Sequence, residues 1–308
     1  MFFKNLRIYR FNRPIPWTQQ ELADHLQTHR FVPCQAQDAF RLGWSPCAPA
    51  VDGEALTLDQ GHFTLIALRR EDKILPGSVV KEAVEQRIAE IELREQRRVG
   101  GREKTELKTQ LTTELLPKAF ARSRLAFGYI DFAQGLLMLD TASGTKADEF
   151  PSFLRQSVGS LPIQFVELQS SPVATLTRWV SENQAPTGFA LADQCELRAG
   201  DATDTVIRCK GSESLHDAVA THIENGMAVT ELSLVWEDKL KLTVDEGLLI
   251  KRIKALDLDG ERDGGKDRDA ADRFLGNLSL MTLEFGLLFE ALTAALGGED
   301  TSRVELRS

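Results

Sequence analysis

Hydrophobic and polar residues along this chain repeat with two different periods, and each period predicts a type of element. Residues 2–11 (FFKNLRIYRF) and 62–72 (HFTLIALRRED) contain alternating apolar and polar side chains, which predicts strands. Between them, Thr18 and Glu21 have the spacing of a capping box. They predict a helix that begins after Thr18 and runs to about Arg30.

A helical period begins at Ser78. Gly100 and Gly101 interrupt it, a second helix begins near Arg102, and Pro117 ends or kinks that helix. The apolar residues of the first helix recur at spacings of four and three, at Val80, Val84, Ile88 and Ile91. Two amphipathic helices around a double glycine predict an arm that projects from the body of the protein.

The rest of the chain alternates between strand pairs and helices. Residues 124–143 predict a hairpin, and residues 229–244, followed by 247–256, predict another. Residues 33–49 are rich in proline and aromatic side chains without a clear period, so we expect an irregular segment there. This order of elements predicts an α+β fold built from several mixed sheet and helix units.

The most regular apolar pattern lies near the C-terminus. Its side chains follow a four-three spacing: Phe274, Leu278, Met281, Phe285, Leu288, Leu292 and Ala295. Such a seam is typical of a helix that packs along another helix. The pattern alone favours a helix that closes its own domain as much as one that forms a dimer interface.

Composition narrows the class of protein. The chain has 308 residues, of which 42% are hydrophobic, and a formal net charge of −9. Its four cysteines form no Cys-x-x-Cys pair, which excludes the usual zinc spacings and favours reduced thiols. Neither a signal peptide nor an uninterrupted apolar stretch of ~20 residues is present. We expect a soluble cytoplasmic protein with no membrane association.

Charge is distributed unevenly along the chain. The segment from Arg69 to Arg124 holds 14 Lys/Arg and 10 Asp/Glu, a balance of +4, whereas the remainder has a balance of −13. A basic segment in an acidic protein suggests a polyanionic partner that contacts one surface only. Alternatively, the glutamates of this segment pair with its cations on a solvated helix face. Charge counting alone favours this second interpretation.

Residues suited to catalysis are not grouped in the sequence. There is neither a dinucleotide-binding nor a phosphate-loop glycine motif, and Ser, Cys and His are too scattered to suggest a nucleophile with its base. A nuclease would need a cluster of carboxylates to hold metal ions, and none is visible. We therefore expect a protein that is not an enzyme and that uses no cofactor or metal.

Several longer phrases identify a family. FKNLRIYR, PCQAQDAFRLGW, EDKILPGSVVKEAV, LLPKAFARSR, LRQSVGSLP, LTRWVSENQAPTGF and THIENGMAVTELSLVW occur in this order over most of the chain. As a set they resemble the RdgC family of recombination-associated proteins. The resemblance implies a nucleoid-associated homodimer, closed into a ring, whose basic central hole encloses duplex DNA without sequence preference. It also implies that the protein limits recombination by the RecA recombinase.

The expected domain organisation combines the pattern and the resemblance. Residues 1–75 and 125–170 form a central α+β domain. Residues 76–124 form the helical arm with a gate at its tip, and residues 171–308 form a second α+β domain that ends in a long interface helix.

The resemblance also implies site residues. The gate phenylalanine, which enters an apolar pocket of the other subunit, corresponds to Phe120 in LLPKAF, and Lys210 is the one residue carried over from a DNA-contacting loop. The second dimer contact is assigned to Phe274, Leu278, Met281, Phe285 and Leu288. The expected DNA contacts of the arm region are Lys73, Lys81, Arg97, Arg98, Lys118 and Arg122. An alternative function is a protein-interaction module that restrains RecA by direct contact, without enclosing DNA.

Overall fold

Two antiparallel sheets form the body of the protein. The computed structural model describes residues 3–200, 205–211, 214–256, 269–302 and 304. The first sheet has the order β2-β4-β5-β6-β1-β7, with β3 also paired to β4. Its strands are β1 (Arg7–Phe11), β2 (Phe40–Ser45), β3 (Thr57–Gln60), β4 (Phe63–Ile74), β5 (Phe120–Asp131), β6 (Leu136–Leu139) and β7 (Ile163–Phe165).

The second sheet has the order β12-β11-β10-β8-β9. Its strands are β8 (Phe189–Ala199), β9 (Val206–Lys210), β10 (Met227–Trp236), β11 (Leu240–Asp245) and β12 (Ile250–Ala255). Together with the helices, these sheets confirm the predicted α+β class.

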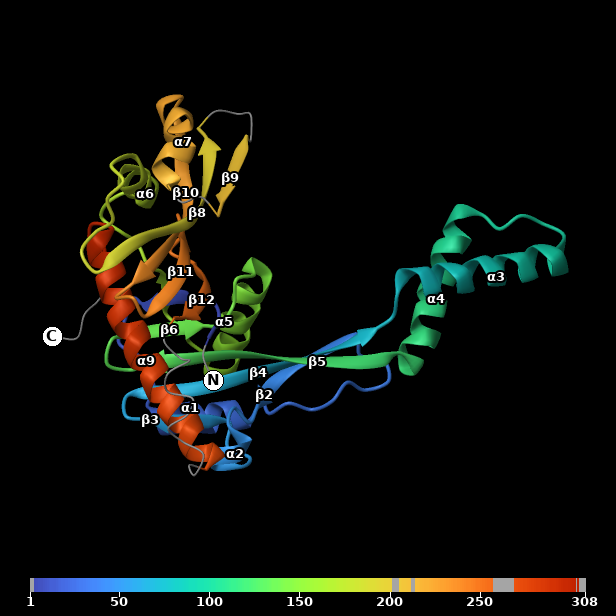
Figure 1. Ribbon diagram of the computed structural model, residues 1–308. Coiled ribbons are helices and arrows are strands. Elements are labelled where there is room, and N and C mark those ends of the chain that lie inside the picture. The colour runs from blue at the N-terminus through green and yellow to red at the C-terminus, as the bar shows by residue number, and fades with distance from the viewer. Residues whose placement is uncertain (1–2, 201–204, 212–213, 257–268, 303, 305–308) are drawn as a thin grey trace.

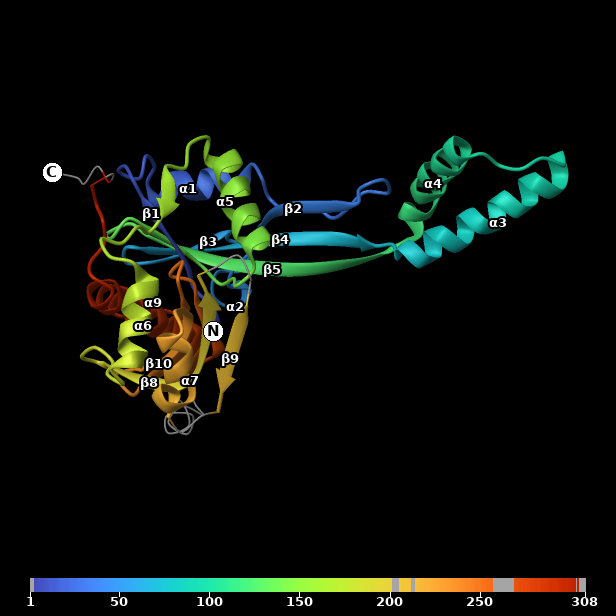
Figure 2. The same cartoon turned by 90° about the horizontal axis from the view of Figure 1, so that it is seen from above.

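Helices cover both sheets (Figures 1 and 2). α1 (Gln19–Gln27) and α5 (Gly144–Val158) lie on one face of the first sheet, whereas α9 (Ala270–Ala295) and the short α2 (Pro49–Asp52) lie on the other. α6 (Pro172–Ser181) and α7 (Leu215–Glu224) pack against the second sheet.

The start of α1 is the predicted capping box. The Thr18 hydroxyl accepts the Glu21 backbone N–H, and the Glu21 carboxylate accepts the Thr18 backbone N–H at 2.8 Å. Donation to this carboxylate by the Thr18 backbone N–H, and also by the Thr18 hydroxyl, lowers the pKa of Glu21 below its usual value. The helix buries Leu22 and Leu26 against the first sheet and ends at Gln27, three residues before the expected end.

Two hydrophobic clusters hold the body together. One lies between the first sheet and the α1–α5 layer, where the Trp44 indole N–H donates to the Ser157 hydroxyl at 2.8 Å. The other contains Phe3, Tyr129 and Phe285, together with side chains from β8, β10 and β11. Because this second cluster includes residues of both sheets and α9, the two predicted α+β domains meet through a common core.

The apolar seam of α9 belongs to that core. Met281, Phe285 and Leu288 are fully buried, and Leu278 is 3% exposed. Phe274 is half-buried against the same cluster. Leu278, Met281, Phe285 and Leu288 are therefore covered by their own chain and offer no free surface for the predicted dimer contact, whereas Phe274 stays a predicted contact.

The physical reason is the position of α9, which runs across both sheets (Figure 1). Side chains of both sheets, together with the short α2, cover the seam. The exposed apolar residues of α9 are Leu280, Leu283 and Leu287 on another face. Among the described residues, α9 is the one helix long and apolar enough to cross a membrane, and the burial of its seam in the fold is typical of a core helix.

The predicted arm is a β-ribbon that ends in a helical hairpin. β4 and β5 pair from Phe63 opposite Asp131 to Ile74 opposite Phe120, and their distal halves leave the body (Figure 1). At the far end lie α3 (Gly77–Glu95), α4 (Gly101–Leu115) and the 3₁₀ turn η1 (Leu116–Lys118). Phe120 therefore lies where the ribbon joins the helices, and not at the turn between them as a gate at the helical tip would require.

The apolar stripe of α3 is only partly covered. Val80 is buried, but Val84, Ile88 and Ile91 are half-buried, because α4 is the one helix that packs against α3 in the described chain. On α4, Leu107 and Leu111 are buried.

The expected irregular segment contains a strand. β2 pairs with β4 from Phe40 opposite Asp72 to Ser45 opposite Ala67. Gly43 is required within it, since a Cβ atom there would lie 2.3 Å from the Cα atom of Phe31. The preceding loop thus packs directly on the strand, an arrangement that the local pattern does not show.

Candidate nucleic-acid interface

Arg97 is part of the arm's own structure. Its guanidinium donates to both carboxylate oxygens of Glu103, at 2.7 and 2.8 Å, and to Glu95 at 2.8 Å. These bonds raise the pKa of Arg97 and lower the pKa of Glu103, while hydrogen bonds from Arg94 and then Arg97 lower the pKa of Glu95. The guanidinium fork thus links the end of α3 to the start of α4, and the predicted DNA contact of Arg97 would compete with these two carboxylates.

Other cations of this region also have acidic partners. Arg70 pairs with Asp72 at 2.7 Å and with Glu149, and Arg124 lies 3.5 Å from Asp72. Arg94 pairs with Glu95, and Arg102 with Glu106. These contacts favour local ion pairing for the half-buried Arg70, whereas Arg94 and Arg102 are strongly exposed.

Lys81 is an intermediate case. Its ammonium lies 3.8 Å from Glu85, and both side chains are strongly exposed. An exposed pair of this kind contributes only about 0–1 kcal/mol, so the side chain can readily exchange partners. Lys81 stays a predicted DNA contact.

A second group of cations is free of ion pairs. Within the described residues, Arg98, Lys118 and Arg122 are exposed and have no acidic partner in hydrogen-bonding or ion-pairing range. Lys104 and Lys108 on α4 share this property, although the sequence interpretation did not single them out. Their spacing of four residues along one helix is the pattern that could have identified them.

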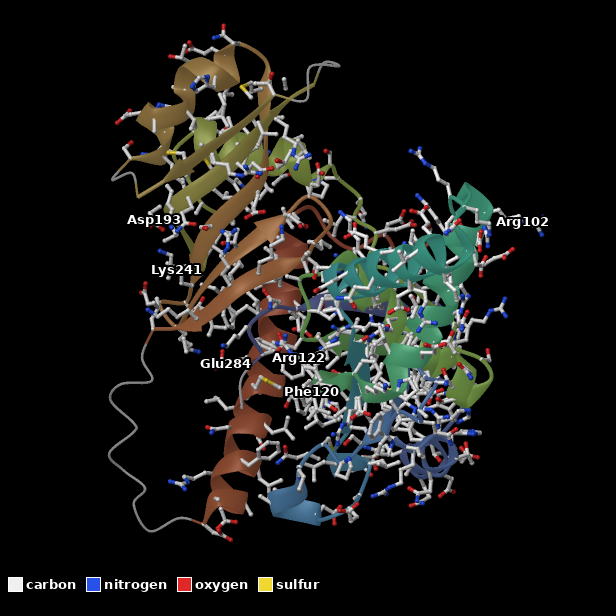
Figure 3. All side chains as sticks on the ribbon, turned by 90° about the vertical axis from the view of Figure 1, so that its right-hand side faces the viewer. Arg102, Phe120, Arg122, Asp193, Lys241 and Glu284 are labelled. Carbon is white, nitrogen blue, oxygen red and sulfur yellow. The ribbon has the colours of Figure 1, made fainter. Side chains whose placement is uncertain are left out.

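Phe120 lies between two of these cations, Lys118 and Arg122. Its side chain is 85% exposed and stands opposite Ile74, which is 48% exposed. Lys118 precedes it by two residues, and Arg122 follows it by two and projects from the same face of the ribbon (Figure 3). Phe120 and Ile74 together form a small exposed apolar surface where the ribbon joins the helices.

Lys73 lies on the opposite face of the ribbon. It pairs in register with Ala121, one residue away from the Asp72–Arg122 pair, so its side chain points away from the face of Phe120. Its ammonium is half-buried and lies 3.5 Å from the Ala119 carbonyl oxygen. The structure therefore does not group Lys73 with Arg122 on one surface.

Lys210 lies far from the arm, at the end of β9 in the second sheet. It is exposed and has no acidic partner among the described residues, whereas its neighbour Arg208 pairs with Glu196 at 2.8 Å. Within one chain, the fold does not bring Lys210 and the arm cations together.

A cavity of about 300 Å³ lies at the base of the ribbon. Its lining combines the cations Arg70 and Arg124 with the acids Asp140 and Glu149. Burial raises the pKa of Asp140, although its carboxylate accepts two backbone N–H groups of the N-terminal segment. The mixed charge makes this cavity a poor site for phosphate, unlike the exposed arm.

Across the described part of the chain, no three His, Cys, Asp or Glu side chains are grouped so that they could hold a metal ion.

Comparison with known proteins identifies the family. A family profile described as "Putative exonuclease, RdgC" matches residues 1–299. A protein of Aeromonas hydrophila named "Recombination-associated protein RdgC" is 38% identical over 98% of this chain and 100% of its own length. A relative with the same name from Pseudomonas fluorescens is 37% identical over 98% of this chain and 99% of its own length. Another, from Edwardsiella ictaluri, is 40% identical over 97% of this chain and 99% of its own length. The relatives' names describe an association with recombination and indicate no catalysis. The chain belongs to the RdgC family.

Proposed function

We propose that this protein binds duplex DNA without sequence preference, as a ring-shaped homodimer that encloses the duplex and limits RecA-dependent recombination. The observation that carries the proposal is the projecting arm, which presents exposed cations without acidic partners among the described residues and, where its ribbon joins its helices, an exposed phenylalanine. Cytoplasmic, nucleoid-associated action follows from the same proposal.

The chemistry of the arm suits a polyanion. Phosphate contacts need long cationic side chains spaced along a surface, and they need no base-reading residue. Arg98, Lys104, Lys108, Lys118 and Arg122 satisfy this requirement, and their charges are not neutralised by the protein. The acidic balance of the rest of the chain discourages DNA from binding elsewhere, which concentrates binding on the arm.

Ring closure would use Phe120 as an anchor. The exposed Phe120 and Ile74 pair offers an apolar surface at the end of a long ribbon, where a second arm can reach it. A closed ring slows dissociation, because the duplex leaves only through an opened contact or over a free end.

The second dimer contact needs a different surface from the buried α9 seam. The exposed residues Leu280, Leu283 and Leu287 are the apolar side chains that α9 still presents. We assign the helical contact of the proposed ring to this face.

Binding is tested by fluorescence anisotropy with random-sequence duplexes over a salt series. The proposal expects equal affinity for unrelated sequences and a steep log–log dependence on salt. Absence of binding at low salt would refute it. The alternative of direct RecA contact would then be tested by a pull-down with nuclease treatment, in which a RecA association that survives digestion supports that alternative.

Enclosure is tested with Phe120→Ser. We expect faster dissociation from circular duplex DNA and weaker dimerisation in sedimentation experiments, because the apolar anchor is lost. Leu93→Ser is the matched control, since Leu93 is 84% exposed on the same arm. Equal off-rates for the Phe120→Ser variant and the parent would contradict the proposed gate.

The family description raises the question of nuclease activity. Duplex DNA incubated with the protein and magnesium should remain intact if the protein acts by binding alone. Cleavage that increases with protein concentration and persists after repeated purification would replace the binding proposal with an enzymatic one.

A further inference from the structure

Two cysteines that are 14 positions apart in the sequence lie side by side in the second sheet. Cys195 on β8 is paired in register with Cys209 on β9. Both side chains project to the inner face of the sheet, where they contact the shared hydrophobic core. The outer face of β9 is marked by the exposed residues Val206, Arg208 and Lys210.

The two thiols differ in access to solvent. Cys195 is 5% exposed, whereas Cys209 is half-buried on a strand that pairs only with β8 among the described strands. Burial, with a smaller contribution from the neighbouring Cys209, raises the pKa of Cys195 to about 12. A small reagent therefore reaches and reacts with Cys209 first.

The ladder fixes the distance between the two residues. Gly211 N–H donates to the Asp193 carbonyl at 2.8 Å, two positions before Cys195 in the ladder. Because hydrogen-bonded pairs alternate along an antiparallel ladder, Cys195 and Cys209 also form such a pair, with Cα atoms ~5.5 Å apart. That separation lies within the range of roughly 4.4–6.8 Å that disulfides span.

The Cβ atoms of such a pair stand about 5 Å apart, compared with a mean of ~3.8 Å in disulfides. Closing the difference requires β9 to move toward β8. An edge strand can make this movement, because no described strand holds its other side. The resulting bond would be strained and therefore easily reduced.

We propose that Cys195 and Cys209 are a reversible oxidation site, which forms a cross-strand disulfide by exchange with a low-molecular-weight disulfide such as oxidised glutathione. The Cys209 thiolate attacks one sulfur of the small disulfide, whose S–S bond breaks and releases one small thiolate. The Cys195 sulfur, losing its proton to that thiolate, then attacks Cys209 and releases the second. Two protein thiols are oxidised, and one small disulfide is reduced to two thiols.

The test uses full-length protein equilibrated in buffers of defined reduced-to-oxidised glutathione ratio, alkylated, and analysed by peptide mass spectrometry. We expect a peptide cross-linked between Cys195 and Cys209 that dithiothreitol removes. In a Cys34→Ser background, which removes the other partly exposed thiol, the titre of free thiols should fall from three to one.

Two results separate this site from simple surface oxidation. Cys209→Ser should abolish the cross-link and leave Cys195 unmodified until the protein is denatured. A stable mixed disulfide of glutathione at Cys209, with Cys195 still a free thiol at every ratio, would overturn the proposal. Oxidation of the unmutated protein already distinguishes the Cys195–Cys209 cross-link from a mixed disulfide at Cys209, so the test does not depend on whether a variant folds.

Discussion

Replacing Lys118 and Arg122 together by alanine should reduce the salt dependence of DNA binding. Both side chains are exposed, flank Phe120 and have no acidic partner among the described residues. Their removal therefore deletes two phosphate contacts without breaking an internal ion pair. Their exposure also means that the fold should lose little stability, within about 0.5 kcal/mol.

The expected magnitude follows from the number of free cations. If one duplex contacts all five free cations of one arm, the log–log slope is about −4.5, at roughly −0.9 per neutralised phosphate. Raising the salt from about 50 to about 200 mM then weakens binding about 500-fold. With three contacts left, the slope is about −2.7 and the same change weakens binding only about 40-fold.

The assay is anisotropy of a labelled random-sequence duplex at four or more salt concentrations. A matched variant, Arg178→Ala with Lys254→Ala, removes the same charge from exposed positions of the body that have no acidic partner in the described chain. It should leave the slope close to that of the parent protein.

Two outcomes would refute the reasoning. An unchanged slope in the Lys118 and Arg122 variant would mean that these residues do not contact phosphate. An equal reduction of the slope by the body variant would mean that total charge, and not the arm, determines binding.

Three further predictions concern stability. Glu299→Gln should lower the free energy of unfolding by about 3 kcal/mol, because the Arg10 side chain is only 12% exposed and loses its carboxylate partner. Urea unfolding measures this change, and a loss below about 1 kcal/mol would contradict the prediction. Arg97→Gln should increase amide hydrogen exchange in α3 and α4 while β8–β12 stay unchanged, and equal exchange in both proteins would count against the assigned role. Because the pKa of Glu21 is lowered in the folded state, its ionised carboxylate stabilises the fold above the ordinary glutamate pKa, and this contribution is lost as the pH falls through the lowered pKa. An NMR titration that gives an ordinary pKa for Glu21 would exclude this pH dependence.

Local sequence features predicted the elements that depend on neighbouring residues. The capping box of α1 and the glycine pair between the arm helices act within a few positions, so their sequence patterns suffice. β2 was missed because its stability depends on pairing with β4 and on contact between Gly43 and Phe31, which are not local in the sequence.

For the candidate site too, the sequence predicted local features but not the contacts that depend on the three-dimensional structure. The sequence identified the basic segment and, through the family resemblance, Phe120. It could not show that Arg97 faces two glutamates whereas Arg98, one residue later, faces none in the described structure, because pairing depends on the direction of each side chain. The seam of α9 was predicted as an apolar surface, but a periodic pattern does not specify whether a helix, a sheet or another subunit covers it.

The shared core of the two sheets has a consequence for synthesis on the ribosome. One face of the first sheet, with Phe3 and Tyr129, is covered by α9, where Phe285 contacts Phe3. The first sheet's hairpin is complete at Leu139, and α9 ends 156 residues later, at Ala295. At translation rates of about 5–20 residues per second, this apolar face lacks the covering helix α9 for roughly 8–30 seconds. We therefore expect the nascent chain to depend on chaperones until its last helix emerges.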